Sequence, residues 1–138
     1  MINLKKIVIL LLCLMLTGCF ENSGYLVKSC TKEEKADTLT NITTYTFGFK
    51  NDIIEDLRIT FDYQDTQNST IQNIKQSLEI ENNYYKLVAN VIIDDPNQYK
   101  VEYQLPLDAD DELKEKYIIR TSRTDLVNLL KNKGYVCE

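Results

Sequence analysis

Two neighbouring runs of alternating side chains constrain the fold of this chain more than any other feature. In residues 41–50, every second side chain is aromatic or β-branched, and these side chains share one face: Thr43, Tyr45, Phe47 and Phe49. Residues 57–63 repeat the pattern with Leu57, Ile59, Phe61 and Tyr63. Alternation with a period of two is typical of β-strands that bury one face. A short turn at residues 50–52 joins the two runs, so we predict an antiparallel hairpin.

Residues 28–37 and 69–81 add a strand and a helix to this hairpin. The first segment is polar, and its charges fit an edge strand that must avoid pairing with other chains. In the second segment the apolar side chains recur at helical spacing: Ile71, Ile74 and Leu78. We therefore predict a helix, with Asn68 or Thr66 as its N-cap.

The second half of the chain predicts two more strands and a terminal helix. Residues 85–93 are rich in Val and Ile, and residues 99–105 alternate cleanly. Their inward positions are Tyr99, Val101, Tyr103 and Leu105. A capping box of Ser122 and Asp125 begins the last helix, and Gly134 ends it. The order β-β-β-α-β-β-α predicts an α+β fold of two layers, an antiparallel sheet with helices packed on one face.

The first 18 residues have the layout of a secretory signal peptide. Lys5 and Lys6 form a positive region, ten apolar residues follow at 7–16, and small residues come next. As a helix the apolar run covers about 15 Å, which is half of a bilayer's hydrocarbon thickness. We therefore expect residues 1–18 to be a cleaved leader.

The border at Cys19 resembles the lipobox of bacterial lipoproteins, because it reads Leu16, Thr17, Gly18, Cys19. This resemblance implies cleavage between Gly18 and Cys19 and a diacylglyceryl group on the Cys19 thiol. Two or three acyl chains anchor a protein stably, at about 0.8 kcal/mol for each buried CH₂. Residues 19–27 would then be a lipidated N-terminus and tether, and residues 28–138 a single α+β domain. We expect the domain to be extracytoplasmic and held to the cell membrane by lipid at Cys19.

Two cysteines remain for the domain, because Cys13 leaves with the leader and Cys19 is acylated. In an oxidising compartment the default expectation is a disulfide between Cys30 and Cys137. A zinc site is the alternative, but it needs four ligands and the chain contains no His.

The charge of the chain argues against nucleic acid as a partner. The formal net charge is −5, and removing a leader that carries Lys5 and Lys6 leaves −7. An acidic domain gains nothing from counterion release at a phosphate backbone. An envelope protein or a small ligand remains as the expected partner.

No motif in the sequence predicts catalysis, a cofactor or a metal. A Ser or Cys nucleophile would lack its usual His base, and four Gly are too few for a phosphate-binding loop. Adjacent carboxylates such as Glu55 and Asp56 point to opposite faces of a strand. One acidic cluster fits the start of a helical turn at residues 109–116, and its alternative is a calcium site: Asp108, Asp110, Asp111 and Glu112. We therefore predict no catalytic residue.

Four tyrosines on the predicted strands are the most suggestive side chains: Tyr45, Tyr63, Tyr99 and Tyr103. The simpler interpretation is that they fill the core between the sheet and the helices. The alternative is an exposed tyrosine surface that stacks sugars or grips a peptide, because Tyr joins a flat apolar face to a polar tip.

Three segments together resemble the YehR-like lipoproteins: "TTYTFGFKND", "YKVEYQL" and "DLVNLLKNKGYVCE". The resemblance covers residues 28–138. It implies the fold and the location but no activity, and it assigns no functional residue. We therefore expect a lipid-anchored envelope lipoprotein with a non-catalytic binding domain. The alternative is an accessory or inhibitory subunit that docks on a membrane enzyme or transporter.

Overall fold

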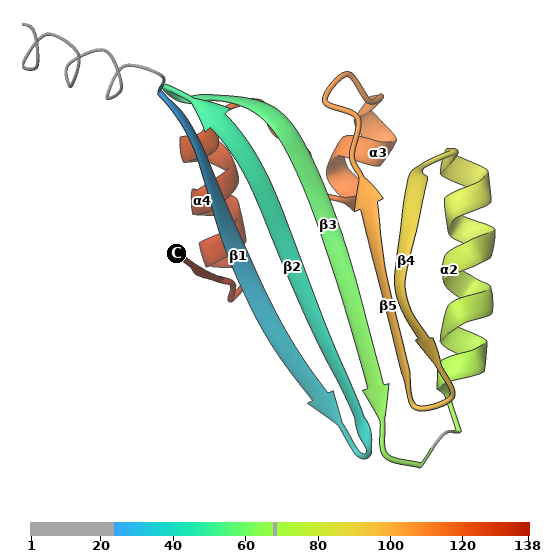
Figure 1. The fold of residues 1–138 in the computed structure, drawn as a ribbon. Helices are drawn as coiled ribbons and strands as arrows, with labels where there is room; N and C mark the ends of the chain where they lie inside the picture. The colour runs from blue at the N-terminus through green and yellow to red at the C-terminus, as the bar shows by residue number, and fades with distance from the viewer. Residues whose placement is uncertain (1–23, 68) are drawn as a thin grey trace, which may run out of the picture.

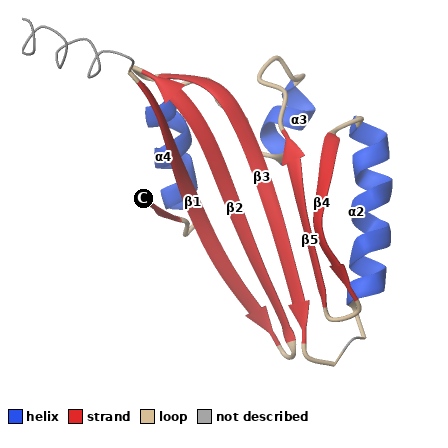
Figure 2. Cartoon of the chain, viewed as in Figure 1, coloured by secondary structure: helices blue, strands red, loops and turns tan. Residues whose placement is uncertain are grey.

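The computed structural model describes residues 24–67 and 69–138 and confirms the predicted α+β class (Figure 1). The predicted leader, Gly18 and Cys19 lie outside the described residues, as does Asn68. The strands are β1 (Tyr25–Ala36), β2 (Leu39–Lys50), β3 (Ile53–Asp65), β4 (Val88–Asp95), β5 (Gln98–Gln104) and β6 (Val136–Cys137). The helices are α2 (Ile71–Tyr85), α3 (Asp111–Lys116) and α4 (Arg123–Asn132) (Figure 2). In the described part of the chain the strands form one antiparallel sheet in the order β4-β5-β3-β2-β1-β6.

The register of the sheet places one row of side chains on a single face. Cys30 lies opposite Tyr45, Tyr45 opposite Ile59, and Ile59 opposite Tyr103. All four are buried, and Phe47 and Leu57 repeat the arrangement one step along their strands. The alternation predicted for residues 41–50 and 57–63 is therefore confirmed, and it identifies the core face.

Helices cover this face at both ends of the row. The Tyr103 hydroxyl donates to the carbonyl of Leu78 in α2, and the Tyr45 hydroxyl donates to the carbonyl of Tyr117 after α3 at 2.7 Å. Leu126 and Leu130 of α4 are fully buried in the same cluster. These contacts confirm the prediction that the helices pack against one face of the sheet.

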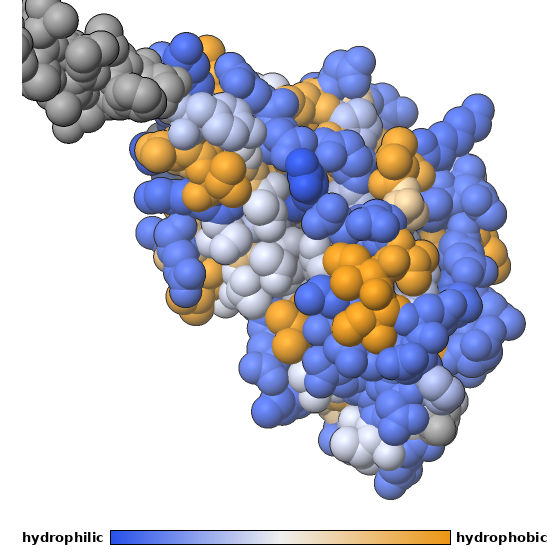
Figure 3. Space-filling view, viewed as in Figure 1, coloured by the Kyte–Doolittle hydropathy of each residue, from blue (hydrophilic) through white to orange (hydrophobic). Residues whose placement is uncertain are grey.

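The opposite face of the sheet carries no helix in the described residues and is turned toward the viewer in Figure 1. Hydroxyl side chains line part of it, and Thr31 contacts Thr44 across the first two strands at 3.2 Å. Figure 3 shows mostly hydrophilic and intermediate colouring over this face, with apolar side chains gathered on the β4–β5 side.

Some strand and helix boundaries differ from the sequence prediction because contacts with distant residues determine them. β1 begins at Tyr25, three residues before the predicted domain start, because Tyr25 pairs with Lys50 across the sheet. α2 runs through Tyr85, where a strand was predicted, because Tyr85 packs edge-on against Tyr117 and donates to Glu112. Residues 117–119 form a loop between α3 and α4 in which Ile118 has φ +54°.

Asp65, rather than the predicted Thr66, organises the start of α2. Its buried carboxylate accepts from Thr38 Oγ1 and Thr70 Oγ1 at 2.7 Å each, and from the backbone of Gln67 at 2.9 Å. Hydrogen bonds from Gln67, Thr38 and Thr70 stabilise the charged form and hold the pKa of Asp65 far below its usual range. One carboxylate therefore ties the β1–β2 turn to the chain that enters α2.

Candidate functional site

The predicted tyrosine surface is not exposed. Tyr45, Tyr99 and Tyr103 are each 2% exposed, and Tyr63 is half-buried. They share the face that the helices cover, and desolvation raises the pKa of Tyr45 and of Tyr103 well above the usual value. The groove interpretation is therefore wrong for the three buried residues, and the core interpretation is correct.

Cys30 and Cys137 meet as the sequence predicted. Their Sγ atoms are 2.04 Å apart, and the two residues pair across β1 and β6. The backbone N–H of Glu138 also donates to Ser29 at 3.0 Å. The last residues are therefore fastened to the first strand of the sheet.

The acidic cluster at residues 108–112 has a structural role in helix capping. Asp110 is the N-cap of α3, and its side chain accepts from the backbone N–H of Leu113 at 2.9 Å. Within residues 24–67 and 69–138, no three His, Cys, Asp or Glu side chains gather as metal ligands. The helices in this described part are too short or too polar to cross a membrane.

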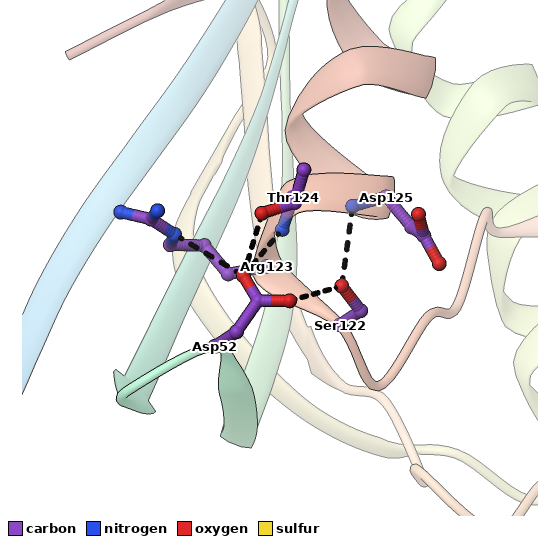
Figure 4. Close-up of polar contacts among 5 residues, drawn as sticks. All are labelled: Asp52, Ser122, Arg123, Thr124 and Asp125. Carbon is purple, nitrogen blue, oxygen red and sulfur yellow. Dashed lines mark hydrogen bonds and ion pairs between the residues drawn. The ribbon is translucent and has the colours of Figure 1, made fainter.

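Asp52 fastens the β2–β3 turn to the start of α4 (Figure 4). Its carboxylate accepts from Ser122 Oγ at 2.6 Å and from both the backbone and hydroxyl of Thr124, at 3.0 and 2.7 Å. Ser122 in turn accepts from the backbone N–H of Asp125, which confirms the predicted capping residue. The hydrogen bonds from Ser122 and Thr124 lower the pKa of Asp52 to about 2. The turn at this end of the sheet is therefore held in one position at neutral pH.

A cationic groove lies between the first strands and α4. Its volume is about 260 Å³, and its basic lining residues are Lys28, Arg123 and Lys131. Arg123 is already engaged, because its guanidinium lies 5.1 Å from the centre of the Phe49 ring and 3.6 Å from Asp52. The carboxyl-terminal Glu138 also lines the groove. These neighbours offset part of the positive charge that would recognise an anion.

The β4 edge is the more distinctive surface, because apolar side chains are exposed along a strand that pairs on one side only. β4 lies at the end of the sheet and hydrogen-bonds to β5. Val88, Val91 and Ile92 are 73%, 50% and 47% exposed. The register shifts between Val91 and Ile93. Sequence analysis predicted a strand here but not its place at the edge, since that place depends on pairing with distant residues. The signal that was available is the absence of charged residues between Leu87 and Ile93.

The sheet and its helical layer place the chain in the α+β class, and comparison with known proteins agrees at the level of fold. A solved structure described as "NMR structure of the protein from Streptococcus pneumoniae TIGR4" is similar, with a TM-score of 0.50 and 9% sequence identity. The alignment covers 83% of this chain and 85% of that one. No protein-family model and no curated protein matches the chain. At this identity the likeness concerns the fold alone.

Proposed function

We propose that this protein is a lipid-anchored lipoprotein of the cell envelope whose domain binds a partner protein through the β4 edge. The anchor is Cys19, placed by the lipobox resemblance and the leader before it. The observation that carries the binding surface is the exposed apolar edge of β4.

The two edges of the sheet differ in the charges that discourage strand pairing. The outer side of β1 is covered by β6 at Cys30 and Thr31 and then carries alternating charges, with ion pairs between Lys32 and Glu34 and between Lys35 and Glu33. Charges of this kind discourage strand pairing. The β4 edge lacks them from Leu87 to Ile93. An edge without such protection is suited to accept another strand.

Strand addition supplies both affinity and selectivity at such an edge. Main-chain groups of β4 that face away from β5 would hydrogen-bond to an extended partner segment, while the apolar side chains contact its alternate residues. Asp95 ends the strand and is exposed. The partner segment is therefore expected to be extended, apolar at its centre and basic at one end.

Position-specific crosslinking in the native membrane tests this proposal. A photoreactive side chain at Ile92 of the full-length chain should capture one stoichiometric protein, whereas the same probe at Val136 should not. Val136 is the matched control because it is 73% exposed and apolar but lies in β6. The variant Ile92→Lys, probed from Val91, should lose the crosslink because a charge is placed on the edge.

The proposal fails if Ile92 and Val136 capture the same proteins, or if Ile92→Lys leaves the crosslink intact. A crosslink between two copies of the chain would show that the β4 edge mediates self-association rather than binding to a partner protein. If the captured protein is a membrane enzyme or transporter, the lipoprotein acts as its accessory subunit.

A further inference from the structure

Exposed apolar side chains gather at one end of the sheet, which we call the N-terminal end. They are Tyr25, Leu26, Val27 and Ile53, which are 46%, 57%, 61% and 63% exposed. Tyr25 pairs with Lys50, and Lys50 pairs with Ile53, so three adjacent strands finish in one row. Figure 3 shows apolar surface at this end of the sheet.

The row is held in place by packing and by polar contacts. The Tyr25 ring lies over Gly48, where an added Cβ would come within 1.9 Å of the phenolic oxygen. The backbone of Ile54 donates to Thr121 at 2.8 Å, next to the Asp52 contacts with α4. Apolar side chains at this end are therefore presented by fixed backbone.

Charges of both signs occur at this end, because Glu55 of β3 is exposed beside the two exposed lysines of β1 and β2. Lys28 and Lys50 are exposed, and neither lies within ion-pairing distance of a described carboxylate. The carboxylate of Asp52, which is the nearest acid in sequence to Lys50, is occupied by Ser122, Thr124 and Arg123. The end therefore combines an aromatic residue and aliphatic residues with two lysines and one exposed acid, Glu55. Aromatic, aliphatic and lysine side chains together are typical of membrane-interface segments.

The chain leaves the sheet from this same end toward Cys19. Cys19 precedes Tyr25 by six positions in the sequence, with five residues between them. A fully extended chain spans at most about 3.6 Å per residue, so the end lies within about 22 Å of an acyl anchor at Cys19.

We propose that the N-terminal end of the sheet docks on the membrane surface, with Tyr25, Leu26 and Ile53 in the interfacial layer and Lys28 and Lys50 on anionic headgroups. This inference rests on the anchor at Cys19 in the proposed function. Each Lys near an anionic surface strengthens membrane binding about fivefold. Docking at this end sets the height of β4 above the membrane. Across the sheet, the first residue of β4 lies in one row with Ser29 of β1, through Gln104, Arg58 and Thr46. Ser29 is four residues from Tyr25, so the β4 edge starts about 13 Å above the surface and stays accessible.

Tryptophan fluorescence in brominated vesicles tests the docking, because the chain contains no Trp. The full chain is produced with its own leader, purified from membranes and reconstituted in vesicles that contain phosphatidylglycerol. The variant Tyr25→Trp should lose most of its emission when the lipids carry brominated acyl chains. The matched control is Tyr84→Trp, because Tyr84 is 69% exposed on α2, and its emission should not change. Ile53→Trp provides a second probe of the same end.

A vesicle-bound protein in which the Tyr25→Trp and Ile53→Trp variants keep their emission would overturn the docking and leave the anchor intact. Purified protein that binds the vesicles although mass spectrometry finds no diacylglyceryl group on Cys19 would instead overturn the anchor. Replacing Lys28 and Lys50 together by Gln should weaken quenching in anionic vesicles but not in neutral ones. If the variant is quenched as strongly as the parent protein in anionic vesicles, the two lysines do not contribute to docking.

Discussion

Replacing both Cys30 and Cys137 by Ala should destabilise the domain by up to about 4.8 kcal/mol. The bridge closes a loop with a sequence separation of 107. In the chain-entropy model the cross-link removes about 2.1 + 1.5R ln 107, or roughly 16 cal/mol/K, from the unfolded chain. At 25 °C that corresponds to about 4.8 kcal/mol, and native proteins lose about 2–5 kcal/mol in practice. Alanine is chosen because Cys30 is fully buried and a Ser hydroxyl would be left there without water.

Thermal unfolding followed by circular dichroism measures this loss. For a domain of this size the unfolding entropy is about 0.24 kcal/mol/K, so the full loss lowers Tm by about 20 °C. The Cys137→Ser variant should also melt below the oxidised wild type. Reduced wild type is the matched control and should melt close to the double variant. If the oxidised wild type and the double variant melt within a few degrees of each other, the bridge does not stabilise the domain and the reasoning is refuted.

Two further predictions concern the core and the pH dependence of stability. Leu126→Ala should cost about 2–5 kcal/mol in chemical denaturation, because the side chain is fully buried under the sheet, and a loss below 1 kcal/mol would contradict that packing. Asp65→Asn should lower stability at neutral pH. The folded pKa of Asp65 is depressed, so its contribution is present above the unfolded value of about 3.9 and is lost as pH falls toward the folded pKa. Urea midpoints of variant and wild type should therefore differ at pH 7 and converge in acid, and a constant difference would count against the proposed network.

Local patterns predicted the parts of the fold that depend on neighbouring residues in the sequence. Alternation identified the core face of β2 and β3, because successive side chains of a strand point to opposite faces. The Ser122 cap was predicted because its hydrogen bond spans three residues. Both features are decided within a few residues of the chain.

The sequence prediction failed where pairing or packing with distant residues decides the structure. β1 starts early because Tyr25 pairs with Lys50, and β6 forms because Val136 and Cys137 meet β1. For the tyrosines the sequence left two interpretations open for a similar reason: alternation predicts that they share a face, but only the helical layer determines that this face is covered. The exposed edge at β4 follows from the strand order, which no single segment encodes.

The anchor at Cys19 is the central claim, and mass spectrometry of the mature N-terminus tests it most directly. The protein should be produced in its native host as the full chain and as the Cys19→Ser variant, and both should be isolated from membrane and soluble fractions. Wild type should begin at Cys19 with the mass of a diacylglyceryl group, and Cys19→Ser should accumulate as uncleaved precursor. An unmodified Cys19, or normal cleavage and membrane retention of the variant, would contradict the anchor and with it the docking of the N-terminal end.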